Sequence, residues 1–274
     1  MFKIPAKDLV WDLSTPQVMG IINCTKDSFY AASRQENEAA VLLKVAQFIQ
    51  EGVSIVDIGA QSTRPNAKLI SAANEIESLV PVIQSIRKIY PELLISIDTF
   101  YGETAQACLE AGGNIINDIS CGSFDPTLLS IVAKQNAGFI GMHLTGSIHA
   151  MHEIAPRENI MDALMAYFEQ KKKLLSLAGI QQWVIDPGFG FGKTIEENFK
   201  LVRELGQLKS MGLPILLGAS RKSSIYKTLG ITAEEALNGT SMTNTVALLN
   251  GVNIIRVHDV KEAVELVKLL PFLK

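Results

Sequence analysis

With 274 residues, 47% of them hydrophobic, the chain could form one large barrel-type domain or two smaller domains, and it has ample apolar material for a core. Its formal net charge of −3 provides no basic field for nucleic acid and no polybasic patch for a membrane surface. The three cysteines include no Cys-x-x-Cys pair, so we expect neither a disulfide framework nor a zinc site. No apolar run reaches the roughly 18 residues of a membrane span, and the N-terminus has no signal-peptide pattern. We therefore expect a cytoplasmic protein.

After a short N-terminal segment, which we expect to form a hairpin over residues 1–13, one unit repeats along the chain. Each unit has a short apolar run, a polar residue, a loop, and a stretch with the 3.6-residue period of a helix. The eight runs lie at residues 18–23, 54–59, 94–98, 114–118, 139–143, 183–186, 214–220 and 253–258. Such runs predict strands buried on both faces by crossover helices.

These eight units predict an α/β fold of the (β/α)₈ TIM-barrel type, in which residues 1–274 form a single domain with a short N-terminal extension. A flavodoxin-like or Rossmann sheet would need fewer units, and no Gly-x-Gly-x-x-Gly fingerprint is present. Within the helices, Thr194 and Glu197 form a capping-box pattern, and Asp125 should cap a helix that begins with proline. Pro81 should kink the second helix or mark a broken start. That helix should turn Ile76, Leu79, Ile83 and Ile86 inward.

The stretch Trp183–Thr194 is the most informative segment of the chain, because its apolar run ends on Asp186. Pro187 stops the strand, and glycines at positions 188, 190 and 192 allow positive φ or close approach to a ligand. A carboxylate on a rim beside two phenylalanines suits a flat, nitrogen-rich ring, which offers adjacent N–H donors and an aromatic face. Alternatively, the stretch is a tight loop whose phenylalanines belong to the core.

In such barrels the active site lies at the C-terminal mouth, so the polar residues that end the runs are candidates. One group fits a neutral heterocycle and consists of Asp98, Asn117 and Asp186. A second group fits a polyanion such as diphosphate and consists of Lys222, Arg256, His258 and Arg64. Arg256 and His258 alternate on their strand and should point to the same side. Asn23 could offer its amide oxygen to a Mg²⁺ ion that also holds the diphosphate.

Other polar residues have simpler explanations. Asp57 stands two positions before a strand-ending glycine and should be an internal hydrogen-bonding residue, and Asp118 could cap its own loop. The histidines at positions 143, 149 and 152 lack the helical zinc spacing and a nearby acid, so we do not expect a metal site there. Gly192-Lys193-Thr194 is similar to the end of a phosphate-binding P-loop, but that motif needs glycine at the position of Pro187.

Taken together, these residues resemble the dihydropteroate synthase family of folate biosynthesis over nearly the whole chain. The segments similar to its motifs are Met19–Phe29, Ser62–Pro65, Ser96–Thr99, Asn117–Asp118, Asp186–Phe191, Ser220–Ser223 and Arg256–Asp259. Members of the family join 6-hydroxymethyl-7,8-dihydropterin diphosphate to p-aminobenzoate and release diphosphate. The resemblance implies a Mg²⁺-dependent transferase with these two small-molecule substrates, and it implies a homodimer.

The resemblance also implies roles for individual residues. Asp98, Asn117, Asp186 and Lys222 would hold the pterin, whereas Asn23, Thr63, Arg64, Arg256 and His258 would serve the diphosphate and Mg²⁺. Thr63, Pro65, Phe191, Lys222 and Ser223 would lie near the aminobenzoate, and Met142 is assigned to the substrate site. The catalytic residues would be Asp98, Lys222, Arg256 and His258. Charge supports this allocation, because cations can stabilise leaving diphosphate and Asp98 can stabilise a cationic methylene.

The sequence departs from the family pattern in two loops. The family usually reads Thr-Pro-Asp-Ser-Phe followed by Asp-Gly-Gly where this chain has residues 25–33, with Lys26 in place of the proline, and it has Gly-Glu where this chain has Ala60-Gln61. These changes bear on loop closure and aminobenzoate affinity. Two rival functions are a pterin-binding methyltransferase, which does not need the Ser-Arg-Lys-Ser loop or the Arg-x-His pair, and a paralogue that binds pterin without turnover.

Overall fold

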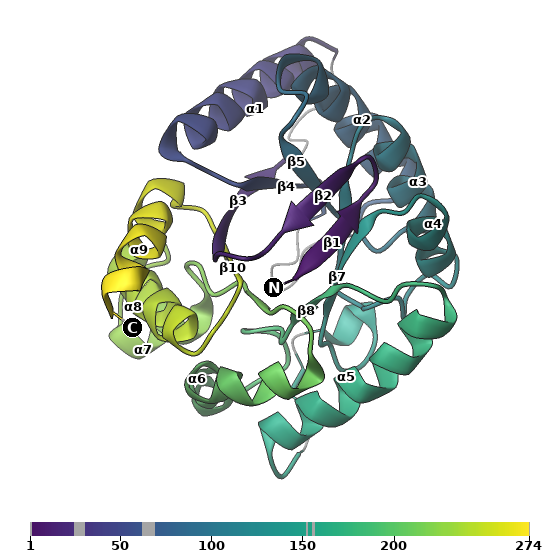
Figure 1. Cartoon of the computed structure of the whole chain (residues 1–274). Helices are drawn as coiled ribbons and strands as arrows, with labels where there is room; N and C mark the ends of the chain where they lie inside the picture. Colours follow the sequence, from purple (N-terminus) through teal and green to yellow (C-terminus); the bar gives the residue numbers. More distant parts are fainter. Residues whose placement is uncertain (1, 25–30, 62–68, 152, 155–156, 274) are drawn as a thin grey trace.

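Eight parallel strands form one sheet in the order β8-β7-β6-β5-β4-β3-β10-β9 (Figure 1). The computed structural model describes all residues except 1, 25–30, 62–68, 152, 155–156 and 274, and for residues 31–37 it describes the backbone alone. The strands are β3 (Gln17–Asn23), β4 (Ile55–Gly59), β5 (Leu94–Asp98), β6 (Ile115–Asp118), β7 (Gly138–Met142), β8 (Val184–Asp186), β9 (Leu216–Leu217) and β10 (Ile254–Val257). A parallel bridge between Ile185 and Ile215 joins the two outer strands and closes the barrel.

The helices surround the strands as an outer ring (Figure 1). They are α1 (Ala31–Glu51), α2 (Ala72–Ile89), α3 (Gly102–Glu110), α4 (Leu128–Lys134), α5 (Ile160–Leu177), α6 (Ile195–Glu204), α7 (Ser223–Leu229), α8 (Leu237–Leu249) and α9 (Val260–Leu273), with short 3₁₀ helices at Ile148–Ala150 and Leu205–Met211. Their apolar faces bury against the sheet; on α1, for example, Val41, Val45 and Phe48 are buried at helical spacing. The predicted (β/α)₈ barrel is confirmed.

An antiparallel hairpin of β1 (Lys3–Ala6) and β2 (Leu9–Asp12) crosses one end of the barrel, as predicted for residues 1–13 (Figure 1). Its buried side chains pack on the first inward residues of the barrel strands. This cluster contains Ile4, Ala6, Trp11, Leu13, Met19, Ile55, Ile115, Ile140, Val184, Leu216 and Ile254. The hairpin thus plugs the N-terminal end of the barrel with apolar side chains, and the polar chemistry gathers at the opposite, C-terminal mouth.

The two-residue period of the strands sorts side chains between the barrel interior and the helix layer. On β4, Val56 and Ile58 belong to the core beneath the helices, whereas Ile55 belongs to the cluster inside the barrel. Asp57 therefore faces the interior. The same alternation turns Ile255 and Val257 of β10 outward and leaves the intervening Arg256 inside.

One helix start differs from the prediction, one of the two alternatives for Pro81 is excluded, and one capping prediction is confirmed. Helix α4 begins at Leu128, so Asp125 does not cap its first turn; the carboxylate accepts from Gly102 N at 2.6 Å and Thr127 N at 2.8 Å, tying α3 to the turn before α4. Helix α2 is continuous through Pro81, so this residue does not mark a broken start. The capping box of Thr194 and Glu197 is confirmed at the start of α6.

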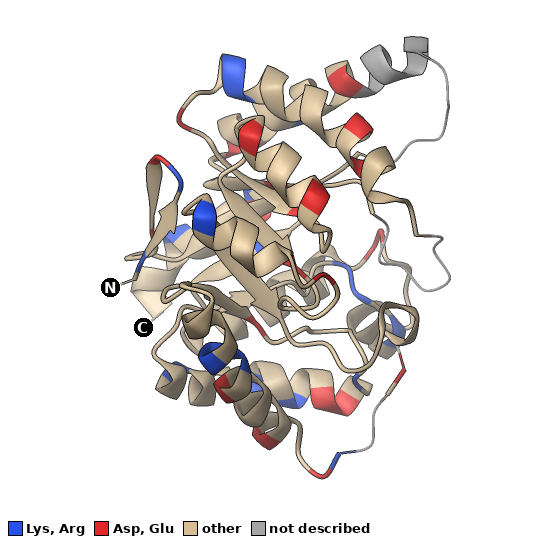
Figure 2. Cartoon of the chain, turned by 90° about the vertical axis from the view of Figure 1, so that its right-hand side faces the viewer, with Lys and Arg blue, Asp and Glu red and all other residues tan. Residues whose placement is uncertain are grey.

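Charged residues of both signs are interspersed over the helices in the view of Figure 2. Among the helices that the structure describes, none is both long and apolar enough to cross a membrane.

Candidate active site

A charged network lies inside the barrel near the C-terminal ends of β4, β5, β6 and β10. Arg256 Nε donates to Asp57 Oδ2 at 2.6 Å, and Arg256 Nη2 donates to Asp98 Oδ2 at 2.7 Å. Asn117 Nδ2 donates to the same Asp57 oxygen at 3.1 Å. Asp57 is fully buried, which confirms it as an internal hydrogen-bonding residue. One guanidinium therefore links two carboxylates from neighbouring strands, and an amide completes the group.

The two carboxylates share a single cation, and this affects their ionisation. Burial raises the pKa of Asp98 to about 7; Arg256 opposes this increase, and the charge of Asp57 reinforces it. Burial lowers the pKa of Arg256, but the charges of Asp57 and Asp98 outweigh burial and raise it above its ordinary value. Arg256 thus stays charged, and Asp98 gains or loses a proton near neutral pH.

Glu75 of α2 is a further buried carboxylate next to this network. The periodicity of the sequence predicted that Ile76 faces inward. In the structure Glu75 is buried instead, and Ile76 is half-buried. Glu75 Oε2 accepts a hydrogen bond from Oγ1 of Thr99 at 2.7 Å, and Thr99 directly follows Asp98 in the chain. Burial raises the pKa of Glu75, and its charge in turn raises the pKa of Asp98. Helical periodicity could not find this residue, because it assigns inward positions to apolar side chains.

Asp186 ends β8 and is nearly buried at the mouth, with 8% of its surface exposed. Its Oδ1 accepts from Gly188 N at 2.8 Å. Gly188 has φ 70°, and a Cβ there would lie 2.3 Å from the carbonyl oxygen of His143. The turn that aims Asp186 therefore requires glycine at this position. Burial raises the pKa of Asp186, whereas the charge of Lys222 and the bond from Gly188 lower it.

Lys222 lies against the other side of the same loop. Its Nζ donates to Phe189 O and lies 4.1 Å from the centroid of the Phe191 ring. A Cβ on Gly190 would lie 2.7 Å from Lys222 Cδ, so this glycine lets the lysine approach. Burial lowers the pKa of Lys222 to about 8, and Asp186 opposes the shift. Ser223, the next residue, begins α7 and is half-buried.

His258 follows β10 and meets the loop after β9. Ser220 Oγ lies 3.0 Å from His258 Nδ1, and His258 N donates to the same hydroxyl at 3.2 Å. Because the hydroxyl accepts from the backbone N–H, it can donate its own proton to Nδ1, and the ring would then carry its proton on Nε2. Arg221 has φ 55° and pairs with Asp259 at 2.6 and 2.9 Å, fixing the loop around Ser220.

An apolar cluster walls the mouth beside these polar groups. Its buried members are Phe100, Ile119, Met142, Leu144, Met151 and Phe191. Two of them, Met142 and Phe191, are residues that the sequence assigned to the substrate site. The other four come from loops that follow β5, β6 and β7. Sequence reasoning missed them because it considered the polar strand ends.

Members of the predicted ring-binding group and of the predicted diphosphate-binding group lie close together at the mouth. Arg256, assigned to the diphosphate, contacts Asp98. Lys222 interacts with the loop of Asp186, and His258 contacts Ser220, in the loop that also carries Lys222. Cationic side chains and carboxylates therefore alternate around the mouth and do not form two separate groups. Asp118, by contrast, accepts from Ser120 N at 2.7 Å and from Gly122 N, and thus holds its own loop as the sequence suggested.

Asn23 ends β3 beside Gly59 of β4 and has an exposed side chain. Among the described residues, no three His, Cys, Asp or Glu side chains come close enough together to hold a metal ion. Mg²⁺ is often bound in proteins through one or two side-chain oxygens together with substrate phosphates, and an exposed amide at the mouth fits that donor set. Thr63, Arg64 and Pro65 lie outside the described residues.

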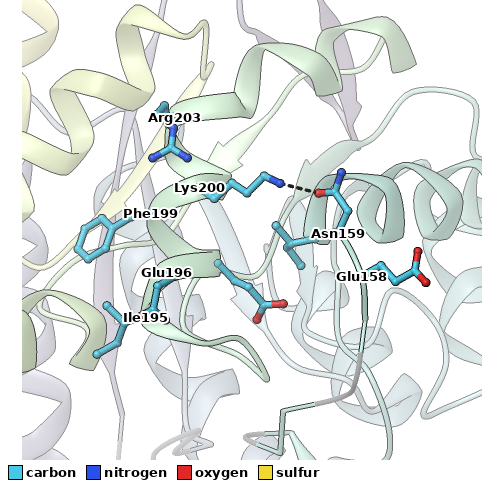
Figure 3. Close-up of a pocket in the computed structure, with 9 residues that line it drawn as sticks. Glu158, Asn159, Ile195, Glu196, Phe199, Lys200 and Arg203 are labelled. Carbon is cyan, nitrogen blue, oxygen red and sulfur yellow. Dashed lines mark hydrogen bonds between the residues drawn. The ribbon is translucent and has the colours of Figure 1, made fainter.

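A pocket of about 440 Å³ opens between the starts of α5 and α6 (Figure 3). Its lining mixes acidic and basic side chains, and Lys200 Nζ donates to Asn159 Oδ1 at 3.0 Å across it. The N-termini of both helices are already capped, by Asn159 and by Thr194. None of the predicted site residues that the structure describes lines this pocket, so it is separate from the described part of the mouth.

Comparison with known proteins identifies the family. A model described as pterin binding enzyme matches residues 19–258. A dihydropteroate synthase of Synechocystis sp. is 37% identical over 254 residues, which cover 92% of this chain and 88% of that protein. The Yersinia pestis dihydropteroate synthase in complex with a sulfonamide drug has a TM-score of 0.92 at 32% identity and 99% coverage of both chains. The Xanthomonas albilineans dihydropteroate synthase with 4-aminobenzoic acid has a TM-score of 0.90 at 30% identity, covering 99% of this chain and 97% of that one. The resemblance inferred from the motifs is thus confirmed, and the chain belongs to the dihydropteroate synthase family of pterin-binding enzymes.

Proposed function

We infer that this chain is a dihydropteroate synthase, a transferase that condenses 6-hydroxymethyl-7,8-dihydropterin diphosphate with p-aminobenzoate to give 7,8-dihydropteroate and diphosphate. Family membership over nearly the whole chain supports the reaction. The observation that carries the site assignment is the meeting of carboxylates, an amide and an arginine at one barrel mouth, centred on the contacts of Arg256 with Asp57 and Asp98.

Pterin recognition follows from the acceptors at the mouth. Asp186 is nearly buried, and its second oxygen, Oδ2, is available to accept from ring N–H groups while Oδ1 holds Gly188. Asn117 and Asp98 provide further polar contacts from the facing strands. Met142 and Phe191 belong to the apolar cluster that would lie against the flat ring. Such a site combines an apolar wall with a few fixed polar groups.

The reaction breaks the bond between the pterin methylene and a diphosphate oxygen, and the electron pair leaves with the diphosphate. The methylene left behind is electron-poor and delocalised into the pterin, so the ionised form of Asp98 stabilises it. The aryl amine nitrogen then bonds to the methylene and loses a proton. Because an aryl amine is a poor nucleophile, its positioning contributes more than its deprotonation.

The leaving diphosphate gathers negative charge, which Arg256 and the Nε2–H of His258 are suited to stabilise. We propose that Mg²⁺ is held by Asn23 and the diphosphate, where it would neutralise charge on the leaving group. Chelation with EDTA followed by titration with Mg²⁺ tests this dependence, and full turnover in EDTA would contradict it.

We place p-aminobenzoate beside Lys222, Ser223 and Phe191, between the β9 loop and the Asp186 loop. The Lys222 ammonium over the Phe191 ring offers a cation for the carboxylate and an aromatic face for the ring. The Xanthomonas albilineans relative, which was solved with 4-aminobenzoic acid, supports the choice of this second substrate.

We also propose that two copies of the chain form a homodimer through α8 and α9, which lie side by side (Figure 1). Their exposed apolar side chains are Met242, Val246 and Leu249 on α8, and Leu269, Phe272 and Leu273 on α9. A patch of this kind on a soluble protein marks an interface, and a two-fold axis would bury it against itself. Sedimentation analysis should show a dimer that Val246→Glu dissociates; a monomeric wild type would contradict the proposal.

A cytoplasmic location fits the cysteines, since Cys24, Cys108 and Cys121 are all buried free thiols, as expected in a reducing compartment.

The decisive experiment measures diphosphate release with both substrates present. A synthase releases diphosphate and forms dihydropteroate only when p-aminobenzoate is supplied. A paralogue that binds pterin without turnover would bind the pterin diphosphate and release nothing. A methyltransferase would instead require methyltetrahydrofolate and a corrinoid partner, and activity of that kind would overturn the assignment.

A further inference from the structure

Lys193 is buried beneath the loop that carries Asp186, with 7% of its surface exposed. Its Nζ donates to Gly188 O at 2.8 Å and to Phe191 O at 3.0 Å, and it lies 3.1 Å from His143 Nδ1. In a P-loop the equivalent lysine would reach out to a phosphate. Here the side chain turns inward, so its role has to be sought in the loop itself.

The three neighbours match the three N–H groups of an ammonium ion. Burial and the charges of Lys193 and Arg157 lower the pKa of His143 to about 2, so the imidazole is neutral and Nδ1 can accept. Burial and Arg157 lower the pKa of Lys193 to about 7, whereas Asp186 opposes the shift. Lys222 lowers the pKa of Lys193 further, and Glu197, which pairs with Arg157 at 2.9 Å, raises it.

The carbonyls that Lys193 holds are the two ends of the tight turn, since Phe191 N donates to Gly188 O at 3.1 Å. Gly188 also donates its own N–H to Asp186 Oδ1. The ammonium is therefore connected through Gly188 to the pterin-side carboxylate, and through Phe191 to the apolar wall. Its charge also lowers the pKa of Asp186, which favours the ionised acceptor.

We propose that Lys193 is a positioning residue for pterin recognition: its ammonium fixes the Gly188 and Phe191 carbonyls and thereby holds the ionised Asp186 carboxylate in the mouth. This inference rests on the proposed function, because pterin is the ligand that Asp186 would recognise. A lysine that acted through fold stability alone would affect unfolding without changing how pterin affinity depends on pH.

The test compares Lys193→Met with Lys171→Met. Lys171 is a matched control, since it is also a buried lysine and its Nζ donates to Cys121 O at 2.7 Å and to Ser123 Oγ at 2.6 Å, in the loop after β6. Calorimetry measures the affinity of each protein for a pterin without diphosphate between pH 5 and 8, and chemical denaturation measures stability. The titrations of the ligand itself are common to all the proteins and cancel in the comparison.

We expect Lys193→Met to weaken pterin binding by about tenfold or more at pH 6, where Lys193 is charged, and to move the acidic limit of binding upward. Lys171→Met should lose comparable stability and bind pterin like the wild type. Wild-type affinity and an unmoved acidic limit in Lys193→Met would overturn the proposal. So would equal losses of affinity in the two variants.

Lys193→Gln provides a second variant in case the methionine protein does not fold. Its amide keeps two donors for the carbonyls but carries no charge. Under the proposal it retains part of the affinity, while its acidic limit still moves upward; an unmoved limit counts against the role of the charge. The proposed function fails separately, if the wild-type protein neither binds pterin nor releases diphosphate.

Discussion

Arg256 donates to Asp98 at 2.7 Å, although the sequence assigned the two residues to opposite ends of the substrate. The same guanidinium holds Asp57 at 2.6 Å, so it already neutralises carboxylates inside the barrel before any phosphate arrives. In the proposed reaction, the diphosphate would share Arg256 with Asp98 or draw it away. Either change would leave Asp98 more exposed as a negative charge, at the point where the methylene becomes cationic. Arg256 would thus couple the two ends of the substrate.

Arg256→Ala should accordingly damage both folding and turnover. It leaves the buried Asp57 without its cation, which we expect to cost about 3–5 kcal/mol of unfolding free energy. Loss of a donor to the leaving group should lower kcat by about 10²–10³. Guanidinium chloride unfolding and steady-state assays with saturating substrates measure the two effects. Arg256→Lys is the control, since it keeps the charge but loses the planar fork. Wild-type stability in Arg256→Ala would show that the network does not hold the barrel together.

His258→Ala should affect turnover far more than pterin affinity. The ring is held by Ser220 in the loop after β9, and it should act on charge that develops only as diphosphate leaves. We expect a loss of about 10²–10³ in kcat. Ser220→Ala should give a smaller loss of kcat, because it removes the hydrogen bond that orients the imidazole but keeps the imidazole itself. An equal loss of binding to a plain pterin would contradict this assignment.

Asp186→Asn should cripple pterin binding. The amide introduced by Asp186→Asn would have only one oxygen acceptor. Its NH₂ group would therefore face either an N–H donor of the pterin or the N–H of Gly188, and in both cases two donors would be left unpaired. Each unpaired buried group costs roughly 1–3 kcal/mol. Calorimetry with a pterin ligand measures the loss. Asp118→Asn is a matched control, because Asp118 is also a buried strand-end aspartate and its hydrogen bonds hold its own loop. Unchanged affinity in Asp186→Asn, or an equal loss in the control, would remove Asp186 from the site.

The barrel and the set of strand ends could be predicted because both follow from short-range patterns. Apolar runs and helical periods are local, and parallel strands necessarily bring their carboxyl ends to one mouth. The partners within the mouth are not local. Arg256 is 199 residues from Asp57 and 158 from Asp98, and the sequence contains nothing that pairs them.

Two neighbouring polar residues show that strand alternation could have predicted more of the site. Asn117 and Asp118 end the same strand, and alternation allows only one of them to face inward. The structure turns Asn117 onto Asp57 and leaves Asp118 to bind Ser120. Lys193 could not have been assigned in this way, because its direction depends on the positive φ angles of the glycines around it. A lysine in a loop is usually exposed to solvent, and the acceptors around Lys193 come together only when the turn has folded.

The pH dependence of stability gives the last prediction. Burial raises the pKa of Asp98 from 3.8 to about 7, so between these values the folded protein binds a proton that the unfolded chain does not. The contribution of this group to stability is therefore fully present below about pH 4 and is lost as the pH rises towards 7. Asp98→Asn removes the titration but keeps the shape and an oxygen for Arg256. Relative to the wild type, the variant should gain on the order of 2–3 kcal/mol of unfolding free energy as the pH rises from 5 to 8. Guanidinium chloride unfolding of both proteins at intervals of one pH unit measures the difference. A constant difference, or one that favours the wild type as the pH rises, would show that Arg256 already compensates the Asp98 charge in full.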